Sequence, residues 1–519
     1  MNVPDVSIVV AVYNTMPYLT ECLASLAQQT IGLDRLEIIA VDDGSTDGSG
    51  DELDRWAQLH PGTFKVLHQA NSGGPASPSN RALAIATGRY VFFIGADDYL
   101  GPEAMQRLVT AADDLDADIV LGRMVGAGGR FVSQAVYKAG NRDSITLADS
   151  ALPWALSNTK LFRRSLIEEN GLRYPEELRS CSDQPFTLRA VVAARRIAVR
   201  ADYDFYYAVK RQDGSNITYG TPVTRLLEDT EVVMSTVADV VTDPENRDRV
   251  LRRNFTWEVA KLVGDRFVAA DQESRRQVHE GVRKLAGVHL TEEIRSALGV
   301  RQRVPISVAQ HGTLEDLEAV AESYAEHGLN RLVIESGRFY AALPGFRDPA
   351  KNFPDAWFEA TLKEASAAAQ RDPVVVTSGN GTLRLEWRSA LPELGPGASV
   401  SIGGEKPRVL TAEPVAGALR IRAEFAVTDL AKSGKKQRVT FRHSAAEPAI
   451  KRDLTVDPST FVTVRHRSGL RFYDVTLRAD SKARLTVRVS TFGPRGLAGR
   501  LIRKLRPVSG PRQEGRTPA

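Results

Sequence analysis

Cysteine is nearly absent from this sequence of 519 residues, which has only Cys22 and Cys181. Two cysteines so far apart give neither a disulfide framework nor the ligand spacing of a zinc site, and they suit a reducing compartment. Long apolar runs are absent too, since none approaches the roughly 20 residues of a membrane-spanning helix. Residues 1–5 lead directly into an apolar segment, which leaves no room for a signal peptide. We therefore expect a cytoplasmic protein, or one peripheral to the inner face of the cell membrane.

The body of the chain has almost no net charge, because its basic and acidic residues nearly balance. The chain has a net charge of +4, and residues 495–519 hold seven basic side chains against one glutamate, a charge of +6 that leaves −2 for residues 1–494. The body has no basic stripe interleaved with aromatic residues, so we expect no nucleic-acid partner. Residues 496–506 combine leucine and isoleucine at helical spacing with arginine and lysine, a pattern typical of peripheral contact with anionic membranes. Packing on the preceding domain and terminal disorder are the alternatives.

The spacing of apolar residues changes along the chain and predicts four regions. Residues 1–221 alternate strand and helix patterns, as in an α/β domain with a mostly parallel sheet. Residues 222–369 follow the helical period and predict a mainly helical linker, with a strand-like break at residues 331–334. Residues 370–492 alternate apolar and polar side chains between turns, which predicts an immunoglobulin-like β-sandwich. The basic tail occupies residues 493–519.

Functional side chains follow three of the apolar runs in the first region. The first run of the chain leads to Tyr13, the second ends at Asp43, and a later one is followed by Asp97. Open α/β sheets bind ligands at the carboxyl ends of their strands, so we expect these three side chains to face one site. Two carboxylates and an aromatic ring in that place predict a nucleotide site with a divalent metal.

Four motifs within this region resemble those of the family 2 glycosyltransferases, whose catalytic domain has the Rossmann-like GT-A fold. Residues 11–14 read Ala-Val-Tyr-Asn, residues 41–47 read Val-Asp-Asp-Gly-Ser-Thr-Asp, and residues 95–98 read Gly-Ala-Asp-Asp. Residues 71–81 are similar to the Gly-rich stretch that leads into Ala-Arg-Asn in that family. The order of the motifs makes the match specific, and it covers about the first 220 residues.

The resemblance implies a donor site for a UDP-sugar. Tyr13 would hold the base and ribose, and Asp43 would accept a hydrogen bond from the imide N–H of uracil, a role that suits an acceptor-only carboxylate. The alternative for Asp43 is that it only caps the following turn. The candidate donor-binding residues are Ala11, Tyr13, Asp43, Asn71, Arg81, Ala96, Lys210 and Arg211.

The positive charge that faces the diphosphate departs from the family pattern. The family usually has an arginine where this chain has the uncharged Ser79. Arg81, Lys210 and Arg211 are the candidates to supply that charge instead. For each of them, a solvated helix or turn position is the alternative.

The same resemblance implies a metal site. Asp97 aligns with the metal-binding aspartate of the family's Asp-x-Asp motif, and Asp98 is a second candidate ligand. Bound Mn²⁺ or Mg²⁺ would act as a Lewis acid on the diphosphate, and these hard cations prefer carboxylate oxygens. Gly95 replaces the first aspartate of the motif, which mainly touches the ribose in the family. No histidine falls between His68 and His279, so the histidine ligand of some relatives is missing.

The expected catalytic base is Asp183. The family carries Glu-Asp at the start of a helix on the acceptor side, and here Ser182 and Asp183 take those positions, which keeps the aspartate. Its carboxylate would take the proton of the acceptor hydroxyl during a single displacement with inversion. The alternative, compatible role is a helix N-cap, because Asp183 precedes Gln184 and Pro185.

These features predict an inverting glycosyltransferase that moves a hexose, expected to be GlcNAc, from a UDP-sugar to a cell-envelope polymer. The layout of GT-A domain, helical linker and sandwich is similar to that of the wall-teichoic-acid β-N-acetylglucosaminyltransferases. Their acceptor is an anionic polyol phosphate, and they associate through C-terminal regions, so the resemblance implies a homo-oligomer and a glycan polymer as partners. Outward-facing arginines of the sandwich, Arg420 and Arg422 among them, are candidates to attract that polymer.

Other interpretations remain open at this point. Arginines that alternate along a strand are commonly the solvated face of a sandwich. The acceptor could be a capsular polysaccharide or exopolysaccharide. The replacements at Gly95 and Ser79 also allow a non-catalytic protein that binds a glycan or a nucleotide sugar, although Asp43, Asp97 and Asp183 argue for an enzyme.

Overall fold

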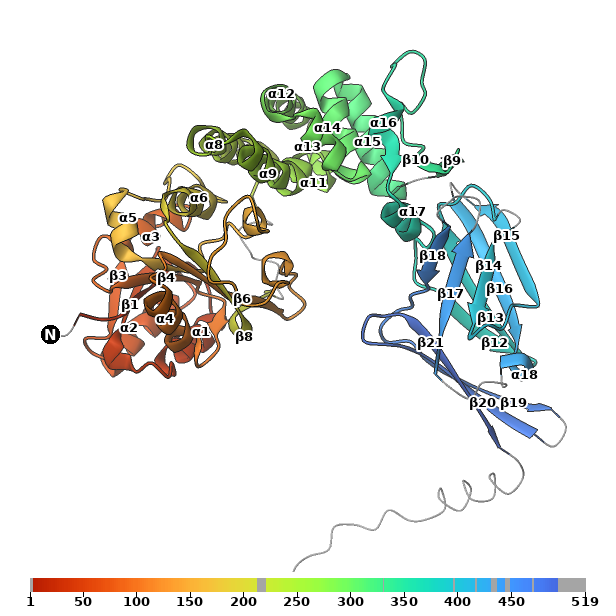
Figure 1. Cartoon of the computed structure of the whole chain (residues 1–519), viewed down its shortest axis with the longest axis horizontal. Helices are drawn as coiled ribbons and strands as arrows, with labels where there is room; N and C mark the ends of the chain where they lie inside the picture. Colours follow the sequence, from red (N-terminus) through yellow and green to blue (C-terminus); the bar gives the residue numbers. More distant parts are fainter. Residues whose placement is uncertain are drawn as a thin grey trace, which may run out of the picture. The chain divides into compact units, whose positions relative to one another are not determined.

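The protein is described by a computed structural model, in which the chain forms two compact units (Figure 1). One unit comprises residues 1–298 and 305–317, and the other comprises residues 299–304 and 318–519. Within the described part of the chain, no helix is long and apolar enough to span a membrane. The described residues are 3–211, 221–329, 331–394, 397–415, 418–430, 436–443, 449–468 and 471–492, so the basic tail lies outside them.

An eight-stranded sheet with the strand order β3-β2-β1-β4-β7-β6-β8-β5 forms the centre of the first unit. Its core pairs are parallel, β1 with β2 and with β4, β2 with β3, and β6 with β8. The short strands β7 and β5 pair antiparallel. The strands are β1 (Val6–Val12), β2 (Leu36–Asp42), β3 (Phe64–His68), β4 (Tyr90–Gly95), β5 (Tyr99–Leu100), β6 (Ile119–Ala127), β7 (Leu161–Arg163) and β8 (Ile197–Val209).

Helices connect the strands of this sheet. Ile8 and Val10 of β1 are fully buried in one apolar cluster with residues of α1, α2 and α4, such as Leu23 and Leu108. Successive side chains of a strand point to opposite faces, so Val9 lies on the other side, where it lines the cavity described below. The helices and short turns are α1 (Tyr18–Ala27), η1 (Leu33–Arg35), α2 (Ser49–Leu59), α3 (Ala76–Leu83), α4 (Ala104–Leu115), η2 (Ala135–Tyr137), η3 (Leu152–Trp154), α5 (Arg164–Glu169) and α6 (Asp183–Ala193).

A helical region follows the sheet. Side chains of Asp243, Asp271 and Thr291 cap three of its helices by accepting a hydrogen bond from the backbone N–H three residues on. Its elements are α8 (Val223–Val240), α9 (Pro244–Asn254), the π-helix η4 (Phe255–Val259), α10 (Ala260–Leu262), α11 (Asp265–Ala269), α12 (Gln272–His289), α13 (Glu292–Ala297), α14 (Val300–His311) and α15 (Leu314–His327).

The strand-like break that the sequence predicts at residues 331–334 is confirmed, because a small antiparallel sheet forms there. Ser336 and Gly337 join β9 (Leu332–Glu335) to β10 (Arg338–Ala341), with φ of 47° and 78°. Positive φ at both central residues is what the tight hairpin turn requires, and the apolar spacing alone does not show it. The sheet and its neighbours also include α16 (Asp355–Phe358), β11 (Glu359–Ala360) and α17 (Leu362–Ala368).

Two antiparallel sheets form the C-terminal sandwich. One has the order β12-β13-β16-β15 and the other β14-β17-β21-β20-β19, with β18 beside β17. Trp387 of β13 packs edge-on against Phe441 of β17 at 5.6 Å, which joins the two inner faces. The elements are β12 (Val375–Gly379), β13 (Thr382–Ser389), β14 (Ser399–Ile402), β15 (Val409–Val415), β16 (Ala418–Ala426), α18 (Val427–Leu430), β17 (Gln437–His443), β18 (Ile450–Asp453), β19 (Phe461–Ser468), β20 (Arg471–Ala479) and β21 (Leu485–Phe492).

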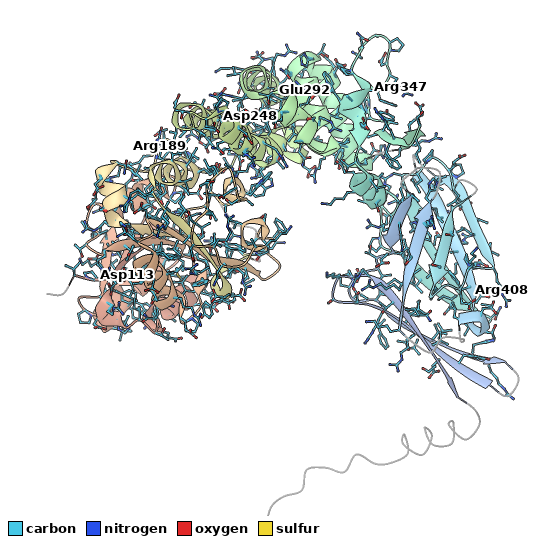
Figure 2. All side chains as sticks on the ribbon, viewed as in Figure 1. Asp113, Arg189, Asp248, Glu292, Arg347 and Arg408 are labelled. Atoms are coloured by element: carbon cyan, nitrogen blue, oxygen red, sulfur yellow. The ribbon has the colours of Figure 1, made fainter. Side chains whose placement is uncertain are left out.

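The arginines on the outer face of the first sandwich sheet are paired. Arg420 lies 3.1 Å from Glu413, and Arg422 lies 3.2 Å from Glu386. Arg408, labelled in Figure 2, is 3.0 Å from Asp429. These contacts neutralise much of the positive charge that the sequence places on this face, as expected of a solvated sandwich surface.

The fold class predicted from the sequence is confirmed: a mostly parallel α/β sheet, a helical region and C-terminal antiparallel sheets follow one another along the chain. The domain boundaries at residues 221, 369 and 492 stay a prediction.

Candidate functional site

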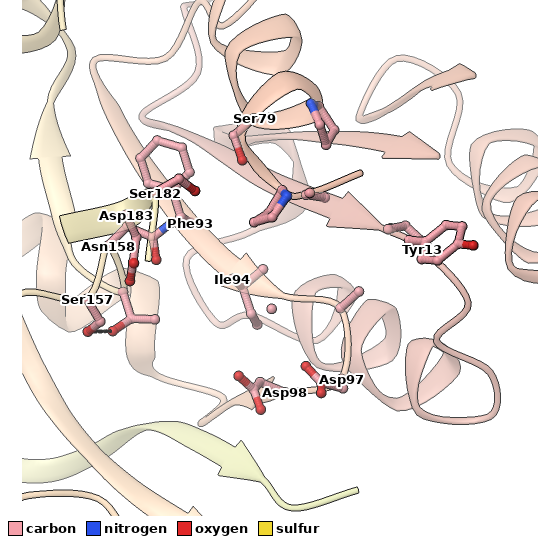
Figure 3. Close-up of a pocket in the computed structure, with 18 of the residues that line it drawn as sticks. Tyr13, Ser79, Phe93, Ile94, Asp97, Asp98, Ser157, Asn158, Ser182 and Asp183 are labelled. Atoms are coloured by element: carbon pink, nitrogen blue, oxygen red, sulfur yellow. Dashed lines mark hydrogen bonds between the residues drawn. The ribbon is translucent and has the colours of Figure 1, made fainter. Parts of the chain in front are cut away.

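The strand ends that carry the predicted site residues open into a cavity of about 550 Å³. β1 lies between β2 and β4, so Tyr13, Asp43 and Asp97 come together at the carboxyl edge of three adjacent parallel strands. Asp183 lines the same cavity from a different segment. Figure 3 shows Asp97 and Asp98 together beyond the end of β4 and Asp183 beside Asn158.

Asp43 is 3% exposed and firmly oriented. One carboxylate oxygen accepts hydrogen bonds from the Gln69 amide at 2.6 Å and the Ser72 backbone N–H at 3.0 Å, and the other accepts from the Ser72 hydroxyl at 3.0 Å. Tyr13 is 44% exposed at the cavity wall, as suits a ring that stacks on a base. Ala11, Asn71 and Ala96 also line the cavity.

The neighbouring Asp42 has a different environment. It accepts hydrogen bonds from the backbone N–H of Ser45 at 3.0 Å and contacts a ring nitrogen of His68 at 3.1 Å. Hydrogen bonds to Asp42 and Asp54 raise the pKa of His68. Asp42 is absent from the cavity lining, so within this pair the turn-fixing role belongs to Asp42 and leaves Asp43 at the cavity.

The two acidic residues after β4 also differ. Asp98 accepts hydrogen bonds from the Tyr206 hydroxyl at 2.5 Å and the Val209 backbone N–H at 2.7 Å, and Arg130 lies 3.6 Å away. Burial, together with the charge of Asp97, raises the pKa of Asp98 to about 6. Both Asp98 oxygens therefore serve the fold, whereas the Asp97 carboxylate accepts a hydrogen bond from Nε of Arg211 at 2.7 Å.

Metal binding beside Asp97 would require ligands from the substrate in addition to those of the protein. Among the described residues, no group of three or more histidine, cysteine or acidic side chains could hold a metal ion. Mg²⁺ and similar cations are commonly bound by one or two carboxylates together with phosphate oxygens and water. Asp97, with Asp98 beside it, fits that donor set when a diphosphate supplies the remaining ligands.

The three basic residues predicted to face the diphosphate are separated in the structure. Arg211 lines the cavity, where it also donates to the backbone oxygen of Asn14 at 3.4 Å. Lys210 is exposed and absent from the lining. Arg81 is exposed and donates to the backbone oxygen of His68 at 2.8 Å, while Ser79 lines the cavity. Roles of Arg81 and Lys210 in donor binding stay a prediction.

Asp183 is the first residue of α6, and Ser182 occupies the N-cap position without a side-chain capping bond. Its carboxylate is therefore not the cap of this helix. Burial raises the pKa of Asp183, and the charges of Arg253 and Lys160 partly oppose that rise. Lys160 is 2% exposed, and burial lowers its pKa to about 7. A half-buried carboxylate with raised proton affinity at the wall of a cavity fits a general base.

Sequence reasoning missed the side chains that hold the Asp183 segment. The carboxylate of Asp229, a fully buried residue of α8, accepts hydrogen bonds from both the backbone N–H and the hydroxyl of Ser180, at 2.9 and 2.7 Å. Arg253 pairs with Glu258 at 2.8 Å and donates to the Gln184 side chain at 2.6 Å. The one signal in the sequence is a charged residue within an apolar helical pattern, and this signal does not identify its hydrogen-bond partner.

An aromatic cluster supports the same segment from the sheet. Phe186 of α6 stacks on Tyr174 at 4.3 Å and lies edge-on to Phe93 of β4 at 5.4 Å. Asn158, which lines the cavity, donates to the Tyr174 hydroxyl at 2.9 Å. The start of α6 is thus fixed relative to β4, which leads to Asp97.

Comparisons with known proteins agree with this geometry. Residues 7–170 match the family model for glycosyl transferase family 2, and residues 227–321 match that for the glycosyl transferase TarS linker domain. Poly(ribitol-phosphate) beta-glucosyltransferase of Bacillus spizizenii is 41% identical over 213 residues, which are 41% of this chain and 33% of that protein. Poly(ribitol-phosphate) beta-N-acetylglucosaminyltransferase TarS of Staphylococcus aureus (strain Mu50) is 38% identical over 207 residues, 40% of this chain and 36% of that protein. The chain thus spans about a third of the length of these curated relatives.

Solved structures extend the likeness beyond the first domain. A crystal structure of residues 1–349 of S. aureus TarS in complex with UDP-GlcNAc matches with a TM-score of 0.56 and 28% identity, over 66% of this chain and 97% of that chain. A longer crystal structure of S. aureus TarS matches with a TM-score of 0.61 and 21% identity over 95% of this chain and 86% of that chain, which shows a shared fold. The chain therefore carries a family 2 glycosyltransferase domain over residues 7–170, followed by a linker domain of the TarS type over residues 227–321.

Proposed function

We propose that the protein is an inverting glycosyltransferase that moves a hexose, N-acetylglucosamine in the first instance, from a UDP-sugar to a polyol-phosphate polymer of the cell wall. The observation that carries the proposal is one cavity that brings Asp43 and Asp97, at the carboxyl edge of the parallel strands, together with Asp183 at the start of α6. The names of the relatives support the polymer and offer glucose as the second donor sugar.

The nucleotide end of the donor is assigned to the region of Tyr13 and Asp43. The Asp43 carboxylate is held by Gln69 and Ser72, so its direction is set before a ligand arrives. A carboxylate has about four lone-pair positions and no donor, so it accepts the imide N–H of uracil and rejects the acceptor nitrogen of cytosine. This favours UDP over CDP as the carrier of the sugar.

The diphosphate is assigned to the end of β4. Asp97 would hold Mn²⁺ or Mg²⁺ there, and the metal would supply Lewis-acid stabilisation of the charge that develops on the departing UDP. Arg211, which contacts both Asp97 and the backbone oxygen of Asn14, ties the ends of β4 and β1 together at this point. It offers a second positive charge close to the leaving group.

Asp183 is assigned as the base. It takes the proton of the acceptor hydroxyl while the oxygen forms a bond to the anomeric carbon and the bond from that carbon to the diphosphate oxygen breaks. Attack from the side opposite the leaving group inverts the configuration. The buried surroundings of Asp183 favour its protonated form, which increases its drive to accept a proton.

The remaining assignments concern the surroundings of the enzyme. We place the protein in the cytoplasm as part of the proposal, with peripheral membrane contact through residues 496–506 and homo-oligomers through the C-terminal region as predictions from the sequence and the layout. The polymer need not follow the outer arginines of the first sandwich sheet, because Arg420 and Arg422 are paired with glutamates.

The proposal is tested by release of UDP from UDP-GlcNAc, UDP-glucose and UDP-galactose, each with and without poly(ribitol phosphate) and Mn²⁺. We expect acceptor-dependent release with a UDP-hexose and loss of release in Asp183→Asn. A protein that binds UDP but releases none with any donor and acceptor would instead be a non-catalytic binding protein.

A further inference from the structure

Three arginines line the cavity, and their environments differ. Arg211 pairs with Asp97 at 2.7 Å, and Arg130 lies 3.6 Å from Asp98. Within the described part of the chain, the guanidinium of Arg179 has no carboxylate partner. Arg179 is exposed to solvent and lines the cavity. It is therefore a positive charge of this site that the fold itself does not use.

The position of Arg179 is defined by the glycine turn that follows Asn71. A Cβ atom on Gly73 would lie 3.7 Å from Nε and 3.8 Å from Cζ of Arg179, so the guanidinium group lies against this turn. A Cβ atom on Gly74 would lie 3.2 Å from the backbone oxygen of Arg179, closer than most such contacts. The two glycines thus leave room for Arg179 at the wall of the cavity, which all three residues line.

The backbone around Arg179 is held on both sides. Leu178 is 2% exposed, and Ser180 is fixed by its two hydrogen bonds to the buried Asp229. The side chain between them remains exposed, although its Cα position is fixed. Because the backbone is already in place, ligand binding at Arg179 orders only the side chain and loses little conformational entropy of the backbone.

The charge balance of the cavity indicates what Arg179 binds. Four carboxylates line the cavity, those of Asp43, Asp97, Asp98 and Asp183, against three arginines. An anionic ligand in such a cavity needs a cation that no carboxylate has neutralised. The planar fork of a guanidinium group matches the oxygens of a phosphate group and binds them through two parallel hydrogen bonds.

We propose that Arg179 binds a phosphate group of a substrate in this cavity. The inference rests on the proposed function, which supplies two sources of that phosphate: the diphosphate of the UDP-sugar and a phosphodiester of the acceptor polymer. Arg179 acts by binding, and its segment brings it four residues before the base, Asp183.

The donor source is tested with UDP and uridine as probes of the full-length protein. If Arg179 contacts the diphosphate, Arg179→Gln weakens UDP binding in calorimetry by about 10- to 100-fold, the scale of a lost charge-assisted hydrogen bond. Uridine affinity stays unchanged, because uridine lacks the phosphates. Arg179→Lys keeps the positive charge but loses the planar fork of the guanidinium group. Its UDP affinity should therefore lie between those of the parent and Arg179→Gln.

The acceptor source is tested by steady-state transfer to poly(ribitol phosphate). If Arg179 contacts the polymer, Arg179→Gln leaves UDP affinity unchanged and raises the KM for poly(ribitol phosphate) by a similar factor, with the increase shrinking as salt is added. Arg173→Gln is the matched control, since Arg173 is an exposed arginine of the same segment that is absent from the cavity lining.

Two results would overturn the inference. One is an Arg179→Gln variant whose UDP affinity and polymer KM both stay within twofold of the parent. The other is an equal loss of UDP and uridine affinity, which means general damage to the site. Failure of the proposed function gives a different result: the parent protein itself releases no UDP from any UDP-sugar in the presence of poly(ribitol phosphate), whether or not it binds UDP.

Discussion

The carboxylate of Asp229 accepts hydrogen bonds from both the backbone N–H and the hydroxyl of Ser180, three residues before the proposed base. Asp229 belongs to α8, the first helix after the central sheet, and it is fully buried. Arg225, one turn earlier on α8, lies 3.3 Å from the same carboxylate and donates to the backbone oxygen of Glu177. The helical region thus helps to hold the segment that leads to the proposed base.

Replacing Asp229 tests this support. Asp229→Ala leaves the Ser180 N–H and hydroxyl without their buried acceptor, so we expect a loss of about 1.5–3 kcal/mol in the free energy of unfolding and slower sugar transfer. Ser180→Ala removes only the hydroxyl donor and should cost less. Denaturant unfolding of both variants beside the parent measures the difference. Equal stability of Asp229→Ala and the parent would show that these hydrogen bonds do not hold the segment.

The proposed base is tested by removing its ability to accept a proton. Asp183→Asn keeps the size of the side chain, so we expect an intact fold and nearly unchanged UDP affinity. Transfer should fall by at least roughly 10²-fold, the usual scale for a general base. Calorimetry with UDP and a transfer assay with the same preparation separate binding from catalysis. Near-parental turnover would eliminate Asp183 as the base.

The part of this site that could be predicted from the sequence depends on local patterns, in which a functional residue directly follows an apolar strand. Asp43 and Asp97 follow apolar strands, and adjacency of β2, β1 and β4 brings strand ends together. The start of α3 was not predictable from apolar spacing: the helix begins at Ala76, so Ser79 faces the cavity and Arg81 contacts the backbone of His68. The sequence pattern predicts a helix that begins at Asn80, four residues later, and that start would place these side chains differently.

Contacts between distant segments could not be predicted either. Ser180 and Asp229 are 49 residues apart, and the apolar period of α8 does not show which buried polar residue faces the site. The same holds for Arg253 and Gln184, which are 69 residues apart. Such contacts depend on how the helices pack on the sheet, which local spacing does not encode.

The pH dependence of transfer should report the charge near Asp183. Asp183 must be deprotonated to act, and burial raises its pKa, so activity is lost as the pH falls through that raised value. Lys160, whose pKa burial lowers to about 7, is charged on the acidic side, where its charge lowers the pKa of Asp183. Lys160→Met removes this charge, and we expect the acidic limb of the kcat profile to move to higher pH. A limb that stays in place or moves to lower pH would contradict the role assigned to Lys160.

The metal proposal predicts a specific loss in Asp97→Ala. In the parent protein, Mn²⁺ should increase the affinity for UDP, because Asp97 would hold the metal and the metal would offset the negative charge of the diphosphate. In the variant, UDP affinity should be the same with and without Mn²⁺. Calorimetric titration of UDP at fixed Mn²⁺ concentrations measures this. An equal Mn²⁺-dependent gain in both proteins would remove Asp97 as the ligand.

Gly95 takes the place of the first aspartate in the family's Asp-x-Asp motif. A Cβ atom on Gly95 would lie 2.9 Å from an oxygen of Asp98 and 3.1 Å from an oxygen of Asp97. Asp98 cannot easily yield, because Tyr206 and the backbone of Val209 hold it. Gly95→Ala should therefore cost about 1–3 kcal/mol of unfolding free energy, as overpacking does, and reduce the Mn²⁺-dependent gain in UDP affinity.

Gly95→Asp distinguishes a loss of metal binding caused by the missing motif aspartate from a steric need for glycine at this position. If the family motif alone decided metal binding, restoring its first aspartate would strengthen Mn²⁺-dependent UDP binding. The structure predicts the opposite, because the new side chain adds a third carboxylate where Asp97 and Asp98 already lie close together. We expect weaker UDP binding than in the parent and a lower unfolding temperature, measured on the same samples as Gly95→Ala. Stronger binding in Gly95→Asp would show that the carboxylates rearrange and that the steric argument is wrong.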